Sequence, residues 1–294
     1  MTIQTAAAAP TATTATPDPM RMGSARMRRP VWRTIPPTVL LASLVLAITT
    51  IWAFWPALMA PYSAYDPVTE VLQPPSLQHV FGSDSVGRDL FSRVIYGTSE
   101  SFAGALVAVG VGLAGGLTLG SVAGSAGGRT DSAIMRVVDV LLAIPGMLVA
   151  LTVVVLLGSG TTNAAIAIGI GSIAGIARLI RSEVVRVRES EYIEAAYGSG
   201  GSFVSVLATH ILPNSIRPIL ALIALQFGGA ILALSALGFL GYGVSPPTPE
   251  WGMIIAQGRN LLGAAWWVTA MPGFVLIAVV LATNRLSHAI GESR

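Results

Sequence analysis

The sequence "EYIEAAYGSGGSFVSVLATHILPN", residues 191–214, is a polar, Ala- and Gly-rich passage inside a chain that is otherwise mostly apolar. Ser190 can cap a helix that begins at Glu191. Glu191 and Glu194 then lie in the first turns, where the helix dipole favours anions. Three glycines predict the end of this helix: Gly198, Gly200 and Gly201. The pattern predicts a short helix at about 190–202.

The side chains of this helix favour docking to another protein. Ala195 and Ala196 are small, so this part of the helix can enter a groove on a partner, with Tyr192 and Ile193 as apolar anchors beside them. Pro213 predicts the end of the short helix that follows. Residues 191–214 are therefore expected to form a compact helical element within a much more apolar chain.

The composition is that of an integral membrane protein. The 294 residues are 53% hydrophobic and 11% charged, with a mean hydropathy of +0.72. Soluble domains carry roughly 25% charged residues. There is no cysteine, and the three histidines are far apart, so no metal site is predicted. No catalytic residues are predicted either, because the sequence has no Gly-x-Ser-x-Gly motif and no paired carboxylates within an apolar run. The net charge of +3 comes from arginine alone, and we attribute it to membrane orientation rather than to nucleic acid.

Apolar runs predict six transmembrane helices after a tail that cannot build a core. Residues 1–37 are Ala-, Thr- and Pro-rich and then basic, and we predict a disordered cytoplasmic tail. The run 38–60 is too long for the apolar core of a signal peptide, so we interpret it as a retained helix. The spans are predicted at about 38–60, 102–126, 133–157, 161–179, 219–244 and 261–283.

Arginine bias gives the expected orientation. The tail carries five arginines and the segment 178–217 another five, against three in the opposite loops. Since positive loops stay in the cytoplasm, both termini are predicted there, including the C-terminal end 291–294. The segments 61–100 and 245–260 are then extracytoplasmic.

Two spans carry further structural signals. Small residues recur every four positions in the second span and predict a face for close helix packing, with a sliding motion along that face as the alternative. The residues of this face are Gly112, Gly116, Gly120 and Gly124.

In the third span, Arg136 and Asp139 stand three apart and predict an intrahelical ion pair. Pro145 predicts a kink in the same helix.

The passage at 191–214 resembles the EAA motif of ABC importer permeases. "EAAYGSG" followed by "HILPN" matches the pattern at Glu194, Ala195, Ala196, Gly200, Leu212 and Pro213. His210 stands where the general pattern has Ile, and "HILPN" is usual in the peptide-transporting branch. The segments 81–97, 135–151, 228–244 and 245–259 resemble the same branch. Leu234 departs from it, because many relatives have an acidic residue there. The resemblance covers about residues 38–290.

This resemblance implies an all-α fold, the type I ABC importer transmembrane domain, with a permease core at 101–290 in the inner membrane of a bacterium. It implies a non-catalytic subunit for import of di- or oligopeptides, working with a second permease, two P-loop ATPases and an extracytoplasmic binding protein. ATP and Mg would be bound by the ATPases, since this chain lacks lysine and so any phosphate loop. The helix at 190–202 would couple to the ATPases through Glu191, Tyr192, Glu194, Ala195, Ala196, Gly200, His210, Leu212 and Pro213.

The loop "GSDSVGRDLFSR", residues 82–93, has two interpretations. Its charged residues contact the binding protein or the partner permease, or they form a local Asp–Arg turn that fixes the start of the second span. They are Asp84, Arg88, Asp89 and Arg93. Trp251, in a proline-rich loop, is predicted as an aromatic anchor at the membrane interface or as part of the same contact surface.

Other functions stay open as alternatives. A related importer for nickel or another small solute would use a very similar permease. A stand-alone secondary transporter is less consistent with the sequence, because such proteins often show inverted repeats and charges within their spans. Neither signal is evident here.

Overall fold

The computed structural model describes residues 36–188, 193, 198–200, 202–206, 209 and 216–292. Nearly all of the predicted tail at 1–37 is therefore outside the described residues. Within the described ranges the regular elements are helical, apart from one isolated bridge between Ser83 and Asp89. The helices are α1 (Pro37–Phe54), α2 (Pro56–Met59), α3 (Leu90–Ala126), α4 (Gly128–Leu142), α5 (Gly146–Leu157), α6 (Thr161–Arg188), α8 (Phe203–Val206), α10 (Ile216–Phe239), α11 (Trp251–Gly258), the 3-10 turn η2 (Arg259–Leu261) and α12 (Trp267–Glu292). The predicted all-α class is confirmed.

Five helices, α1, α3, α6, α10 and α12, are long and apolar enough to cross a membrane, and a sixth span results if α4 and α5 cross together. The kink predicted at Pro145 within 133–157 is observed as a complete break, because α4 and α5 are separate helices that meet at 84°. Pro145 lies in the break between them. Proline lacks the N–H that would continue the helix, and its ring clashes with the preceding turn, so the helix breaks there.

Several predicted helix boundaries differ from the observed ones. The first helix ends at Phe54 and not at 60, since Pro56 begins a separate short helix. α3 begins at Leu90, well before the predicted start at 102, because the Asp89 carboxylate accepts a hydrogen bond from the Ser92 N–H and caps the helix. With 37 residues, α3 is about 55 Å long at ~1.5 Å per residue. A bilayer core is ~30 Å thick, so α3 projects well beyond it.

The C-terminal spans are also shifted. α10 ends at Phe239, before the predicted 244, and the turn that follows uses Gly241 at a φ of +92°. The proline-rich segment after it leads into α11, a helix that we did not predict. α12 starts at Trp267 and continues to Glu292, beyond the predicted 283.

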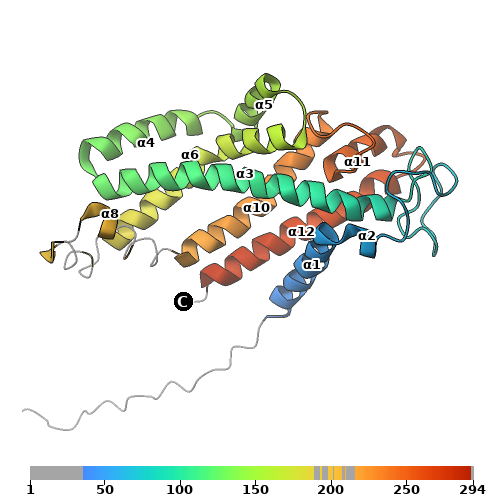
Figure 1. The fold of residues 1–294 in the computed structure, drawn as a ribbon, viewed down its shortest axis with the longest axis horizontal. Coiled ribbons are helices and arrows are strands. Elements are labelled where there is room, and N and C mark those ends of the chain that lie inside the picture. The colour runs from blue at the N-terminus through green and yellow to red at the C-terminus, as the bar shows by residue number, and fades with distance from the viewer. Residues whose placement is uncertain are drawn as a thin grey trace, which may run out of the picture. The chain divides into compact units, whose positions relative to one another are not determined.

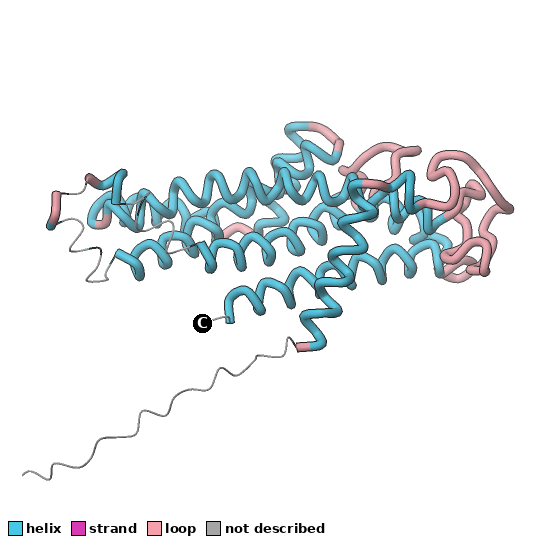
Figure 2. The backbone as a smooth tube through the Cα atoms, turned by 60° about the horizontal axis from the view of Figure 1, so that its bottom comes forward, coloured by secondary structure: helices cyan, strands magenta, loops and turns pink. Residues whose placement is uncertain are grey.

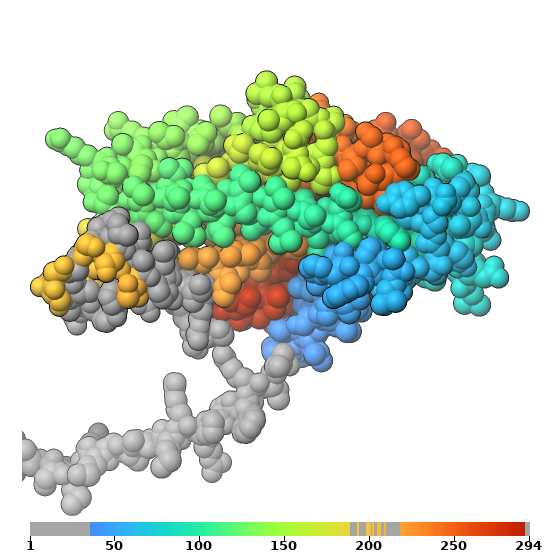
Figure 3. Space-filling model, viewed as in Figure 1, coloured from blue at the N-terminus to red at the C-terminus, as the bar shows by residue number. Residues whose placement is uncertain are grey.

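The helices form an elongated bundle around α3 (Figure 1). α3 and α6 run side by side, and α4 and α5 lie along one side of α3 with α1 on the other (Figure 3). α10 and α12 pack against each other beneath them. Most described loop residues gather where α3 begins (Figure 2). We call the segments 60–89 and 240–266, the second of which includes α11 and η2, the loop cap.

Four glycines bring the backbones of α3 and α6 into close contact. They are Gly112, Gly116, Gly120 and Gly124, and we call this contact the glycine seam. A Cβ atom on Gly116 would lie 2.4 Å from Cγ2 of Ile176, and one on Gly120 would lie 2.5 Å from the carbonyl oxygen of Ala177. Real Cβ atoms do not approach other atoms so closely, so these positions require glycine for the observed separation of the helices.

Ion pairs join α4 to α6 at the end opposite the loop cap. Asp131 pairs with Arg181, with its Oδ2 2.5 Å from Nη2 of the arginine. Asp139 pairs with Arg178. The predicted intrahelical pair between Arg136 and Asp139 is therefore wrong, because Asp139 pairs with an arginine of α6. The ion pairs of α4 thus connect two helices.

Candidate functional site

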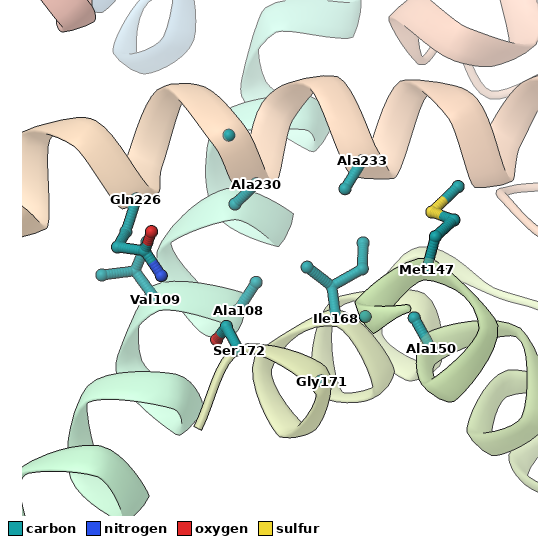
Figure 4. Close-up of a pocket in the computed structure, with 12 residues that line it drawn as sticks. Ala108, Val109, Met147, Ala150, Ile168, Gly171, Ser172, Gln226, Ala230 and Ala233 are labelled. Carbon is teal, nitrogen blue, oxygen red and sulfur yellow. The ribbon is translucent and has the colours of Figure 1, made fainter. Parts of the chain in front are cut away.

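A cavity of about 190 Å³ lies where α3, α5, α6 and α10 meet (Figure 4). Its lining is Ala108 and Val109 from α3, Gly146, Met147 and Ala150 from α5, Ile168, Gly171 and Ser172 from α6, and Gln226, Gly229, Ala230 and Ala233 from α10. The close approach of α5 to α6 shapes one wall, since a Cβ on Gly171 would lie 2.9 Å from the carbonyl oxygen of Gly146. The break at Pro145 thus directs α5 toward this cavity.

The cavity lies near the middle of the spans and is almost entirely apolar. The membrane span within α10 is Pro218–Phe239, so Gln226 lies about 12 Å from one end of the span and about 20 Å from the other at ~1.5 Å per residue. Its side chain extends from α10 into the cavity, toward the side where Val109 and Ser172 lie (Figure 4). The Ser172 hydroxyl donates to the Gly169 carbonyl at 2.8 Å. The cavity therefore offers few polar groups and no charged one.

None of these lining residues was a candidate from the sequence alone. The available signal was a single amide, Gln226, inside the long apolar run 219–244. A polar side chain within a span is costly and often functional. Gly146 and Met147 could not be assigned to the cavity from the sequence, because their position depends on the angle between α4 and α5.

The loop cap holds a buried cluster of charges. The Asp84 carboxylate, 1% exposed, accepts from Nε of Arg88 at 2.7 Å and lies 3.4 Å from Nε of Arg93. It also accepts from the N–H groups of Val86 and Arg88. Arg93 donates through Nη1 to the Ala64 carbonyl at 3.0 Å. One carboxylate thus pairs with two buried arginines and ties the loop to the start of α3.

Asp89 forms a second cluster beside the first. It accepts from the Ser92 N–H and hydroxyl and lies 2.9 Å from Nδ1 of His79, whose ring packs 4.8 Å from that of Tyr62. All four charged residues selected from this loop are buried: Asp84, Arg88, Asp89 and Arg93. Their contacts are those of the predicted local Asp–Arg turn. These side chains therefore fix the shape of the loop, and a partner protein would contact other atoms of the loop.

Trp251 does not act as a membrane-interface anchor. Its side chain is fully buried and donates from Nε1 to the Val94 carbonyl at 3.0 Å, with its ring 5.9 Å from that of Phe102. The predicted exposed position is wrong, because Trp251 opens α11 and this helix packs against α3 and α10.

Glu250 is a buried carboxylate that links three helices. Its oxygens accept from the N–H groups of Gly252 at 2.9 Å and Met253 at 3.0 Å, which caps α11. Oε1 also accepts from the Ser101 hydroxyl of α3 at 3.4 Å. A Cβ on Gly238 of α10 would lie 2.5 Å from Oε2. Burial raises the pKa of Glu250 above its ordinary value near 4.5, although the hydrogen bonds act in the opposite direction.

We expect the stability of the protein to fall as the pH rises through this raised pKa. An acid whose pKa is higher in the folded state favours folding when protonated, and that contribution is complete below its unfolded pKa near 4.5. Between the two pKa values the loss is up to ~1.4 kcal/mol per pH unit. Glu250→Gln should remove this slope in denaturant midpoints measured from pH 4 to 7. Equal slopes in the variant and the wild type would contradict the assignment.

The predicted coupling residues lie mostly outside the described residues. These are Glu191, Tyr192, Glu194, Ala195, Ala196, His210, Leu212 and Pro213. Gly200 is described, and it is exposed with a φ of +87°, as expected of a glycine that ends a helix.

Two described residues of this segment are buried within the chain. Ile193 is 0% exposed and Val206 is 1% exposed, and both pack in a cluster with Ile180 and Val184 of α6 and Ile219 of α10. We predicted Ile193 as an anchor for a partner, and this prediction is wrong, because Ile193 packs against α6 and α10. A displacement of Ile193 or Val206 would act directly on these two helices.

Comparison with protein families gives a match over more than half of the chain. The model of the family described as "Binding-protein-dependent transport system inner membrane component" matches residues 116–292. The dipeptide transport system permease protein DppC of Alkalihalophilus pseudofirmus is 39% identical over 250 residues, which is 85% of this chain and 82% of that protein. The glutathione transport system permease protein GsiD of Escherichia coli is 40% identical over 258 residues, covering 87% and 84%.

A solved structure has the same fold. The inward-facing MetNI methionine ABC transporter contains a chain that superposes with a TM-score of 0.55 and covers 67% of this chain and 96% of its own length. The sequences are 16% identical, so this similarity bears on the fold alone. It agrees with the type I importer architecture expected from the sequence.

Proposed function

The chain belongs to the family of binding-protein-dependent transport system inner membrane components, and on that premise we propose that it is a permease subunit of an ATP-driven importer for di- or oligopeptides. The observation that carries this proposal is the 39% identity with a dipeptide permease along 85% of the chain. The subunit forms half of a translocation path and catalyses no reaction of its own.

The partners follow from this role. They are a second, homologous permease, two P-loop ATPases that bind ATP and Mg, and an extracytoplasmic binding protein that delivers the peptide. The segment 190–202 couples to the ATPases. The Ile193 contacts support this assignment, because they connect that segment to α6 and α10, which both line the central cavity. The ATPases can switch the permease between two states only if they bind those two states with different affinities.

We propose the membrane orientation that the arginine bias predicts. Both termini and the segment 178–217 lie in the cytoplasm of a bacterium, and the loop cap lies outside. The ion pairs between α4 and α6 lie at the proposed cytoplasmic end. The binding protein then meets the loop cap, whose buried charges keep its shape while other residues form the contact surface.

A related importer for nickel or another small solute is the second candidate. A bare metal ion is bound by His, Cys or carboxylate ligands. The central cavity is lined by none of these, and the part of the chain that the structure describes holds no group of three or more such residues. The lining therefore favours an uncharged organic segment over a metal ion.

Uptake of labelled dipeptide by vesicles that contain the complete reconstituted complex tests this proposal. We expect uptake that needs ATP on the cytoplasmic side and the loaded binding protein on the other. Replacement of the phosphate-loop lysine in the ATPases should abolish it. Uptake by this chain without the ATPases would identify a stand-alone transporter, and uptake of nickel in place of peptide would identify the second candidate.

A further inference from the structure

We propose that the central cavity holds one peptide unit of the passing substrate and that the side-chain amide of Gln226 hydrogen-bonds its backbone. The inference rests on the proposed function and adds to it a contact residue and the part of the substrate that is contacted. The other lining residues serve as an apolar wall.

The first observation is that the Gln226 amide lacks a hydrogen-bond partner among the residues that the structure describes. It makes no hydrogen bond with any other described residue, although it lies near the centre of its span. The Gln226 side chain is only partly buried, and it lines the cavity instead of packing within the bundle. Polar side chains within a span typically face the bundle interior or a cavity and mark a substrate path, so this amide can pair with a group that enters the cavity.

The second observation is the size of the cavity. Complete small-molecule sites occupy ~300–1,000 Å³. This cavity has about 190 Å³, which is below that range, so it can enclose a unit of about dipeptide size at most. For longer peptides it is therefore a subsite, and the remainder of such a substrate lies outside it.

The third observation is the chemistry of the lining. A primary amide has one acceptor oxygen and two N–H donors, so it can pair with both the N–H and the C=O of a peptide bond. No lining residue is charged, so a charged side chain of the substrate that entered the cavity would lose its hydration without gaining a counter-ion. The subsite thus suits the backbone and apolar side chains that all peptides share, and it does not select among charged side chains.

The test compares the uptake of two dipeptides by the complete reconstituted complex at saturating peptide and binding protein. One is Ala-Ala, and the other is Ala-Ala methylated on its peptide nitrogen, which lacks the N–H donor. Gln226→Met keeps the volume and removes the amide. Leu225→Met, at the neighbouring exposed position outside the cavity, is the matched control. Copurification with the partner subunits and the basal rate of ATP hydrolysis verify assembly.

We expect Gln226→Met to lower the maximal uptake of Ala-Ala by roughly 2- to 10-fold, which corresponds to one lost hydrogen bond. Uptake of the methylated peptide should change less, and Leu225→Met should change neither rate. Equal effects on both peptides, or no effect, would overturn the inference while leaving the proposed function intact. Loss of the partner permease from the Gln226→Met complex would overturn it too, since Gln226 would then be an interface residue. A wild-type complex that takes up neither these dipeptides nor longer peptides would refute the proposed function itself.

Discussion

Asp84→Ala should destabilise the protein by about 3–5 kcal/mol, the usual cost of removing one partner from a buried ion pair. Asp84 is the counter-charge of Arg88 and Arg93, and both arginine side chains are less than a tenth exposed. Without it, two positive charges stay buried. The Nε and Nη2 atoms of Arg93 already lack a hydrogen-bond partner among the described residues. The midpoint of unfolding of the purified protein in detergent measures the loss.

Asp66→Ala is the matched control in the same loop. Asp66 is exposed and accepts one hydrogen bond, from the Ser63 hydroxyl at 2.8 Å. Surface changes of this kind usually stay within ~0.5 kcal/mol. Midpoints that fall equally in the two variants would show that the buried cluster does not hold the loop cap to α3.

Gly120→Leu should prevent the native packing of α3 on α6. Its Cβ would meet backbone as well as side chain, with Cβ of Ile180 at 2.8 Å and the backbone nitrogen of Arg181 at 3.0 Å. Backbone atoms cannot rotate away, so the two helices must separate along the glycine seam. Overpacking a core costs ~1–3 kcal/mol or more, and a side chain as large as leucine adds to that. We expect a large loss of folded, assembled protein, measured by size-exclusion chromatography in detergent.

Gly110 provides the comparison within α3. A Cβ at this position meets nothing within 4 Å, so Gly110→Leu adds bulk to the same helix without a clash. This variant should fold like the wild type and gain slightly in helix propensity. If both variants elute alike, the close contact between α3 and α6 does not determine the fold.

The sequence predicted the features that follow from local patterns. Spacing by four placed the four seam glycines on one face, and α6 lies against that face. Apolar runs located the spanning segments, because the bilayer sets their length. Whether the helices also slide along the seam stays a prediction.

Features that depend on tertiary contacts could not be predicted in this way. Pro145 indicated a kink, but the 84° angle between α4 and α5 results from how α5 packs on α6. The partner of Asp139 is Arg178 on another helix, which sequence spacing cannot reveal. Trp251 was assigned to the membrane interface because aromatic residues are common there, whereas α3 and α10 bury it.

The central claim, a permease that couples to partner ATPases through the segment 190–202, is tested most directly by ATP hydrolysis of the complex reconstituted in lipid. Hydrolysis is measured with and without peptide-loaded binding protein, in the wild type and in the double variant Glu194→Arg, Ala195→Trp. The variant places a reversed charge and a bulky ring on the proposed docking face. Disruption of a central interface residue costs ~2 kcal/mol or more.

We therefore expect the loaded binding protein to stimulate hydrolysis in the wild type, and we expect that stimulation to fall about tenfold or more in the variant. Unchanged stimulation in a variant that still assembles with all its partners would contradict the account, because the ATPases would then couple to the permease at another site.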